Sequence, residues 1–342
     1  MKNLYITSAS RTAVGSLGKS LKNESSDKLG SSVISDVIKK SSIKESEIDE
    51  VIMGQVLTGG TGQNPARQAA INAGIHFSKP AHIVNQVCGS GLRAVISGYQ
   101  SIKLGEVKNV ISGGQENMSL APHSIFYRDS KKILEEHLID TMINDGLIDA
   151  FNNYHMGVTA ENVAKKFNIS RVEQDDFALN SQKKTETAIN TNRFKEELIK
   201  INQSGINLEE DEHPRKDINK SDLGRLKAVF LKDGTVTPGN SSGINDGAAA
   251  LLLTNFEEAK KKSIQPLVKI ISWASVGVDP SLMGLGPIEA VREAVKKAKW
   301  NLNDVDLFEI NEAFAAQSIA VIRELNIDEN KVNVNGGAIA LG

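Results

Sequence analysis

The chain has a single cysteine, no long apolar run and no cluster of positive charge, and each of these shortages excludes a class of protein. Cys88 is the only cysteine in 342 residues, so no internal disulfide can form and a reducing cytoplasm is the expected compartment. No apolar run approaches the roughly 18 residues that a membrane span needs. Lys and Arg (40) nearly balance Asp and Glu (42), without the clustered positive charge of a nucleic-acid-binding surface. Composition therefore favours a cytoplasmic enzyme with neither a membrane nor a nucleic-acid partner.

The sequence around Cys88 indicates that its thiol takes part in a reaction. An apolar, extended stretch, residues 82–87, leads into the cysteine, Gly89 and Gly91 follow, and residues 92–104 have helical spacing. A thiol at a strand-to-helix turn faces unpaired backbone N–H groups and the positive end of the helix dipole, which favour the thiolate. The glycines leave the sulfur open to a substrate. A lone cysteine is more often a small buried hydrophobe, but this context predicts a nucleophile.

Two parts of the chain share a pattern of helix, short link and apolar strand. The pattern covers residues 29–54 and again residues 288–310, and each copy continues to an Asn-containing strand that ends at glycines, residues 84–91 and 332–337. Two similar α/β halves of this size imply two packed sheets with helices outside and between them. Coincidental likeness is the alternative, because helix–strand units are common.

The stretch between the halves, residues 117–241, does not share their pattern of helix, short link and apolar strand. Residues 158–167 and 172–190 have helical spacing, and Ser170 followed by Glu173 is the pattern of a capping box at the start of the second helix. These two helices are expected to belong to an insertion into the first half.

Eight segments resemble the sequence motifs of thiolases, and they occur in the order found in that family. Asn-Gln-Val-Cys-Gly-Ser-Gly-Leu-Arg-Ala at residues 85–94 is similar to the motif of the acylated cysteine. The other matching segments are residues 8–15, 62–68, 113–119, 155–164, 239–248, 311–315 and 333–342. Because the matches run from one end of the chain to the other, the chain is identified as a member of this family.

The resemblance implies an α/β, thiolase-like fold. Its two similar α/β halves would pack as a layered αβαβα sandwich with an inserted loop domain. We expect an N-terminal half over residues 1–116 and 242–265, a loop domain covering coenzyme A over residues 117–241, and an incomplete C-terminal half over residues 266–342.

Thiolases transfer an acyl group between a cysteine thiolate, coenzyme A and an acyl-CoA carbanion. The resemblance implies that Cys88 accepts the acyl group, and a thiolate suits this role because it is both a good nucleophile and a good leaving group. Asn311 would position a water that donates to the thioester oxygen as the enolate forms. Taken alone, Asn311 could also be a helix N-cap. No bound cofactor or metal is expected, because coenzyme A and acetyl-CoA are substrates.

Matching positions also imply the contacts with coenzyme A. His155 and Met156 would touch pantetheine and line the acyl pocket, Arg215 would stack on adenine as a planar cation, and Ser242 would bond the pantetheine amide. The remaining pocket-wall positions are Phe230, Met283, Ala313 and Phe314. Each residue taken singly has an ordinary structural explanation as core or solvated surface.

The largest departure from the family is at the C-terminus. Family members continue with a histidine that deprotonates the nucleophile and, further on, a second cysteine that acts as acid and base. This sequence stops at Gly342, one residue short of that histidine. We expect a fragment of a longer product, with a natural pseudo-enzyme as the alternative, and we expect the chain as written to be inactive.

The methionine-containing segments at Met156 and Met283 resemble the short-chain members of the family. These members condense two acetyl-CoA molecules to acetoacetyl-CoA and CoA, or run the reverse thiolysis. A homotetramer or homodimer is expected by resemblance only. The alternatives are a 3-ketoacyl-CoA thiolase of fatty-acid degradation and a non-catalytic protein that binds acyl-CoA or forms an oligomer interface.

Overall fold

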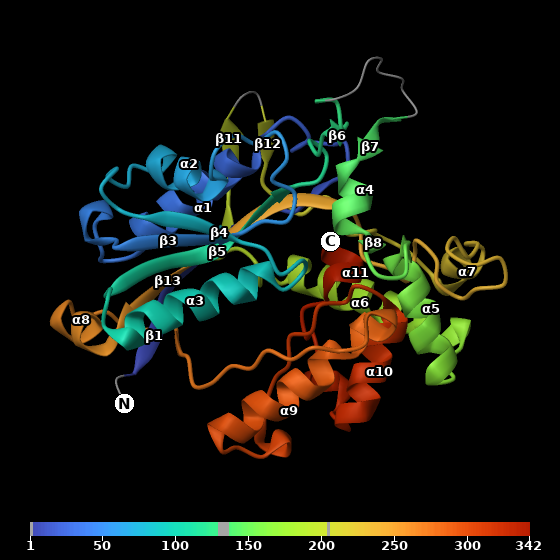
Figure 1. Cartoon of the computed structure of the whole chain (residues 1–342). Coiled ribbons are helices and arrows are strands. Elements are labelled where there is room, and N and C mark those ends of the chain that lie inside the picture. Colours follow the sequence, from blue (N-terminus) through green and yellow to red (C-terminus); the bar gives the residue numbers. More distant parts are fainter. Residues whose placement is uncertain (1–2, 129–136, 204–205) are drawn as a thin grey trace. The chain divides into compact units, whose positions relative to one another are not determined.

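A computed structural model describes residues 3–128, 137–203 and 206–342 (Figure 1). The two internal gaps fall within the predicted insert, 117–241, and their part of that prediction lies outside the described residues. Contacts divide the chain into two compact units. The first unit contains Met1–Gly146, Glu196–Glu210 and Asn245–Ile270, and the second contains Leu147–Lys195, Asp211–Ile244 and Ile271–Gly342.

The first unit is built on an eight-stranded sheet with the order β10-β1-β13-β5-β3-β4, in which β14 also pairs with β1 and β2 with β13. Strand β13 runs antiparallel to both of its neighbours, β1 and β5, whereas β5, β3 and β4 run parallel. The strands are β1 (Leu4–Thr12), β2 (Gly15–Ser16), β3 (Glu50–Gly54), β4 (Ala81–Val84), β5 (Asn109–Asn117), β10 (Leu198–Ile199), β13 (Asn245–Asn255) and β14 (Val268–Lys269).

Helices cover both faces of this sheet. Alternate residues of each strand point to opposite faces, so apolar side chains on both faces are buried under helices. Val51 and Met53 of β3 pack into a core with helices α1 and α2, whereas Ile52 packs into a second cluster with α3. Figure 1 shows α1 and α2 on one side of the strands and α3 on the other. The helices of this unit are α1 (Ser26–Lys40), α2 (Pro65–Asn72), α3 (Ser90–Leu104), α4 (Thr141–Gly146) and α8 (Phe256–Lys261), with the 3₁₀ turn η1 (Glu45–Glu47).

Two small pairs of antiparallel strands also belong to the first unit. Strand β6 (His123–Ser124) pairs with β7 (Ile139–Asp140), and β11 (Ile201–Gln203) pairs with β12 (Ile206–Leu208). Cys88 lies in the short connection between the edge strand β4, which ends at Val84, and helix α3, which begins at Ser90.

The second unit is mainly helical. Helix α10 (Ala315–Leu325) is buried along most of its length and packs against α5 (Met156–Lys166) and α6 (Arg171–Asn190) in one apolar cluster. The other elements are α7 (Lys220–Gly224), α9 (Gly286–Ala298), α11 (Ala338–Leu341), the hairpin β8 (Ile148–Asp149) with β9 (Tyr154–His155), and the 3₁₀ turns η3 (Pro280–Leu285), η4 (Leu302–Asp304) and η5 (Glu329–Lys331). Within the described residues, no helix is long and apolar enough to cross a membrane.

Several local predictions are confirmed. The two helices expected in the insert are α5 and α6, and α6 begins with the capping box of Ser170 and Glu173. Residues 243–253 allowed either a helix or a strand, and they contribute most of strand β13. The strands expected in the C-terminal half, at the end of residues 288–310 and at 332–337, are wrong: neither segment forms a regular strand, and the two are joined by an isolated parallel bridge between Phe308 and Val332.

The predicted division into two halves and a loop domain stays a prediction. The contacts group most of the predicted loop domain with the C-terminal segment in one unit. Strand β14, at the predicted opening of the C-terminal half, pairs with β1, so the first unit extends to Ile270.

The capping box generates a stability prediction. The Ser170 hydroxyl accepts from the Glu173 N–H (3.2 Å), and the Glu173 carboxylate accepts from the Ser170 N–H (2.7 Å). We expect Ser170→Ala to lower the free energy of unfolding by about 1 kcal/mol, measured by urea denaturation. Thr187→Ala, which removes a hydroxyl bonded within the same helix, should change it by less than about 0.5 kcal/mol.

The same box predicts a pH dependence. The Ser170 backbone N–H, the Ser170 hydroxyl and Arg323 lower the pKa of Glu173 from 4.5 to about 2. The stabilisation by the carboxylate is therefore complete above about pH 4.5 and is lost as the pH falls through about 2.

For the stability prediction, an equal loss of stability in Ser170→Ala and Thr187→Ala at neutral pH would contradict the capping role.

Candidate active site

Cys88 lies in a tight turn whose preceding residue is strained. Val87 has φ 48°, in the left-handed region, which is a genuine outlier for a β-branched residue. The Val87 N–H donates to Asn85 Oδ1 (2.9 Å), and the Ser90 hydroxyl donates to the Val87 carbonyl (2.6 Å). The Gln86 N–H donates to the same hydroxyl (2.8 Å). These bonds hold Val87 in its unfavourable conformation and so fix the backbone from which the sulfur projects.

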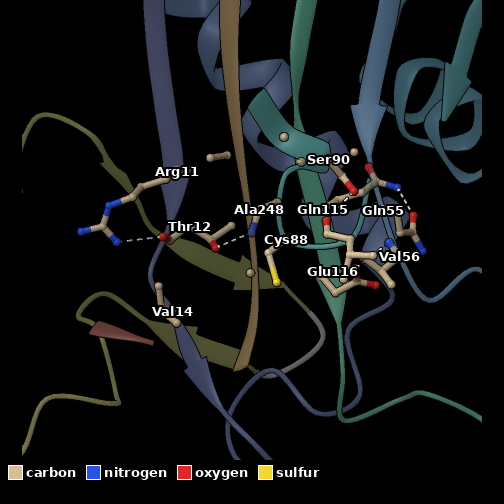
Figure 2. A pocket seen from close by; sticks show the side chains of 16 residues that line it. Arg11, Thr12, Val14, Gln55, Val56, Cys88, Ser90, Gln115, Glu116 and Ala248 are labelled. Carbon is tan, nitrogen blue, oxygen red and sulfur yellow. Dashed lines mark hydrogen bonds between the residues drawn. The ribbon is translucent and has the colours of Figure 1, made fainter. Parts of the chain in front are cut away.

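Cys88 lines a cavity of about 370 Å³ within the first unit (Figure 2). The cavity lies where four strands end or begin, and its wall includes Thr12 of β1, Gly54 of β3, Glu116 of β5 and Ala248 of β13. Strand ends are a common place for binding sites, because the loops that follow them supply side chains while the sheet supplies rigidity.

The predicted lowering of the pKa of Cys88 is wrong in direction. The thiol is reached by solvent, but the surrounding protein removes enough water to raise its pKa, and a backbone hydrogen bond lowers it only in part. The N–H groups of Gly89 and Ser90 donate to the carbonyls of Gln86 and Val87 (both 3.0 Å). These donors were expected to face the sulfur, and they are already used in closing the turn.

Glu116 is a charged wall residue to which the sequence assigned no role. Its two oxygens accept the N–H groups of Val56 (2.8 Å) and Leu57 (3.2 Å), which fixes the loop after β3 against the cavity. Burial raises the pKa of Glu116, the two backbone bonds oppose this rise, and the nearby Asp246 adds to it. The described residues that line this cavity include no histidine.

A second cluster of predicted site residues forms in the second unit. The ring of Phe230 stacks on His155 with centroids 4.6 Å apart and meets Phe314 edge-on at 6.2 Å. Met156, Phe230, Met283 and Ala313 pack as partly buried residues against a small core of Ala160, Val236 and Phe314. The structure therefore brings together the predicted pocket-wall residues from four separate segments of the chain.

His155 is held as a neutral hydrogen-bond donor. It caps helix α5, and its Nδ1 accepts the N–H of Gly157 (3.0 Å), so the neutral ring carries its proton on Nε2. Partial burial lowers the pKa of His155, which favours this neutral form.

Asn311 is exposed beside a buried network. The neighbouring Glu312 is 1% exposed and accepts from Asn333 Nδ2 (2.8 Å), the Ser181 hydroxyl (2.7 Å) and the Ile339 N–H (3.2 Å). Burial raises the pKa of Glu312, and these bonds oppose the rise. The network fixes the backbone on which Asn311 stands.

The two remaining predicted residues, Ser242 and Arg215, lie in different surroundings. The Ser242 N–H donates to the Ala313 carbonyl (3.0 Å), which puts Ser242 beside the apolar cluster. Arg215 is exposed, and its backbone N–H donates to Gln182 Oε1 (3.0 Å). Cys88 belongs to the first unit and the other predicted site residues to the second. Among the described residues, no group of His, Cys, Asp or Glu is arranged to hold a metal ion.

Three site-supporting carboxylates were missed by sequence reasoning: Glu116, Glu161 and Glu312. Each sits inside a motif segment, but an acidic residue in a sequence is more often solvated than buried. No signal in the sequence marked them, because the glycines that make room for two of them lie far away in the chain. A Cβ at Gly234 would overlap the carboxylate of Glu161, and one at Gly337 would overlap that of Glu312.

The α/β fold and the solvent-reached cysteine at a strained strand-to-helix turn place this protein in the class of enzymes with a cysteine nucleophile. Comparison with known proteins narrows this class. The model of the thiolase N-terminal domain matches residues 4–257, and that of the thiolase C-terminal domain matches residues 264–342. The chain therefore belongs to the thiolase family: it is an acyltransferase, and its substrates are of the acyl-CoA class.

Individual relatives agree with this assignment. The chain is 50% identical to an acetyl-CoA acetyltransferase of Rhizobium meliloti (strain 1021), over 99% of this chain and 88% of that protein. It is 49% identical to the cytosolic acetyl-CoA acetyltransferase of Mus musculus, over 99% and 87%. The crystal structure of the Bacillus anthracis acetyl-CoA acetyltransferase matches with a TM-score of 0.96 at 40% identity, covering 100% of this chain and 88% of that one. The predicted family and fold are confirmed.

The cluster around Phe230 generates a test of its packing. A Cβ at Gly157 would overlap the Phe230 ring, so Gly157→Ala must displace the ring from His155. We expect a loss of about 1–3 kcal/mol in the free energy of unfolding, measured by denaturation. Gly224→Ala is the matched control, because nothing lies within 4 Å of a Cβ there. Equal effects of the two substitutions would show that the ring has room to move.

Proposed function

We propose that the protein is an acetyl-CoA C-acetyltransferase. It condenses two acetyl-CoA molecules to acetoacetyl-CoA and CoA, or runs the reverse thiolysis, through an acetyl group held on Cys88. The observation that carries this proposal is the placement of Cys88, the only cysteine, on a braced turn at the cavity. The names of relatives about 50% identical over nearly the whole chain support acetyl-CoA as the substrate.

The proposed reaction has two stages. The Cys88 sulfur attacks the carbonyl carbon of acetyl-CoA, the thiol proton passes to a base, and CoA leaves as a thiolate that is protonated. In the second stage, a base takes an α-proton from another acetyl-CoA, and the resulting carbanion attacks the acetyl carbonyl of the acetyl-enzyme. The new C–C bond forms as the C–S bond to Cys88 breaks, and the released Cys88 thiolate takes up a proton. Because burial raises the pKa of Cys88, the attack of the sulfur needs a base that takes the thiol proton.

The second unit supplies the proposed contacts with coenzyme A. His155 is suited to donate from Nε2–H to a pantetheine carbonyl, since its Nδ1 is already bonded. Ser242 would bond the pantetheine amide, and Arg215 would stack on adenine. Asn311 would orient a water toward the thioester oxygen. These four roles are supported by matching motif positions.

The acyl group would enter the apolar cluster of the second unit. Met156, Phe230, Met283, Ala313 and Phe314 would form its walls. Two methionines and two phenylalanines packed together leave little length for an acyl chain, which favours acetyl and acetoacetyl groups over longer ones.

Three further properties belong to this proposal. The enzyme would use coenzyme A and acetyl-CoA as substrates and hold no bound cofactor. It would assemble as a homotetramer or homodimer. It would act in the cytoplasm, which is supported by relatives named as cytosolic in mouse and rat.

Acylation of Cys88 is the first test. This step does not require turnover: incubation of the purified protein with acetyl-CoA should slowly add one acetyl group to the peptide that contains Cys88, detected by mass spectrometry. Cys88→Ala should abolish the adduct, because no other cysteine is present. Cys88→Ser tests whether the thiolate is needed, since a hydroxyl at this position should react far more slowly. An adduct that survives Cys88→Ala would refute the assignment.

Arg215 provides the second test. Its side chain is exposed, so Arg215→Ala should leave the melting temperature nearly unchanged. Affinity for coenzyme A, measured by isothermal titration calorimetry, should fall about tenfold if the guanidinium stacks on adenine. Lys216→Ala removes a neighbouring exposed charge and should have little effect. Unaltered affinity in the Arg215 variant would remove this residue from the site.

A further inference from the structure

Glu161 is a buried carboxylate whose hydrogen bonds all go to one short loop. It is 7% exposed and lies on α5, the helix that begins after His155. The Thr235 N–H donates to Oε1 (2.8 Å) and Oε2 (3.0 Å), and the Thr235 hydroxyl donates to Oε2 (2.9 Å). The Val236 N–H donates to Oε1 (2.8 Å). A carboxylate, which only accepts, thus meets only donors.

The loop held by Glu161 is the one that carries Phe230. It closes on itself through the bond from the Val229 N–H to the Val236 carbonyl (3.2 Å), and Phe230 is the residue next to this closure. Gln174 of α6 also donates to the Thr235 hydroxyl (2.9 Å). Glu161 therefore anchors the base of the loop to the scaffold of the second unit.

Helix α5 consequently fixes both members of the aromatic stack. It fixes His155 directly, through the bond from the Gly157 N–H, and it fixes Phe230 indirectly, through Glu161 and the loop. The ring of Phe230 lies over Gly157, where any side chain would displace it. The stacking geometry is thus set by one helix at two points.

We propose that Glu161 is a positioning residue of the coenzyme A pocket. Its carboxylate holds the loop of residues 229–236 so that Phe230 stays stacked on His155 and presents a fixed wall to the pantetheine and acyl group. This inference rests on the proposed function, which places coenzyme A against these rings. Hydrogen bonds to an ionised acceptor are roughly twice as strong as neutral ones, so a carboxylate is suited to immobilise such a loop.

Glu161→Gln is the informative substitution. Glutamine keeps the shape but replaces one accepting oxygen with an NH₂ group that faces the Thr235 and Val236 donors. The Phe230 ring should leave His155, and the His155 ring proton shifts should move toward those of Phe230→Ala, measured by NMR without any ligand. The Kd for coenzyme A, measured by isothermal titration calorimetry, should rise about tenfold.

Two further variants guard against a general loss of folding. Thr235→Val removes one donor and keeps the loop backbone, so it should shift the same NMR signals and the Kd for coenzyme A by a smaller amount in the same direction. Glu173→Gln weakens the capping box of α6 and should lower the melting temperature while leaving this Kd unchanged.

A double-mutant cycle separates positioning from support of the fold. In a Phe230→Ala background, Glu161→Gln should add little to the Kd for coenzyme A, because the ring that it positions is already absent. An equal increase of this Kd in both backgrounds, or His155 signals that stay in place in Glu161→Gln, would overturn the inference. If Phe230→Ala itself leaves the Kd unchanged, the proposed placement of coenzyme A fails, and with it the role of Glu161 in binding.

Discussion

The pairing of β13 with β5 at the centre of the sheet is the constraint on which the first unit depends. The two strands are separated by more than a hundred residues, yet their register runs without a break from Asp246 opposite Asn117 to Thr254 opposite Asn109. This register sets Gly247 opposite Glu116 and Ala248 opposite Gln115, so the wall of the Cys88 cavity is assembled by strand pairing itself. A close approach at Gly113, where a Cβ would overlap the Ala249 carbonyl, leaves room only for glycine. A slip of one residue would turn the cavity-facing side chains to the other face.

Local features of the fold were readable from the sequence, whereas features that depend on distant partners were not. The cap of α6 was readable because Ser170 and Glu173 lie three residues apart and satisfy each other's backbone. The Ala and Leu run of β13 shows no alternation of polar and apolar residues, so helix and strand could not be separated from the sequence. The position of Cys88 at a strand-to-helix turn was predicted correctly. The direction of its pKa shift was not, because that depends on which carbonyls the Gly89 and Ser90 donors reach.

A recurring device supports both clusters of site residues. Glu116, Glu161 and Glu312 each place a largely buried carboxylate against one or more backbone N–H groups of another segment. The donors to Glu116 and Glu161 lie outside regular helix and strand, and the Ile339 N–H lies in the first turn of α11, so these N–H groups lack the partners that secondary structure would supply. A carboxylate satisfies two or three such donors at once, which a neutral side chain does less well. Motif resemblance identified the residues that would meet the ligand, but it gave no sign of the carboxylates that hold them.

The strained turn at Val87 bears on how this enzyme could be stabilised. A β-branched residue in the left-handed region costs roughly 1–3 kcal/mol, and this cost is absent from the unfolded chain. Replacement by a residue that tolerates this conformation would be an obvious step in a search for a more heat-resistant protein. If that residue is glycine, it would also give more freedom to the backbone immediately before Cys88, the proposed nucleophile. Thermal tolerance and reactivity are therefore opposed at this position, and a stabilised catalyst has to be sought at sites remote from the turn.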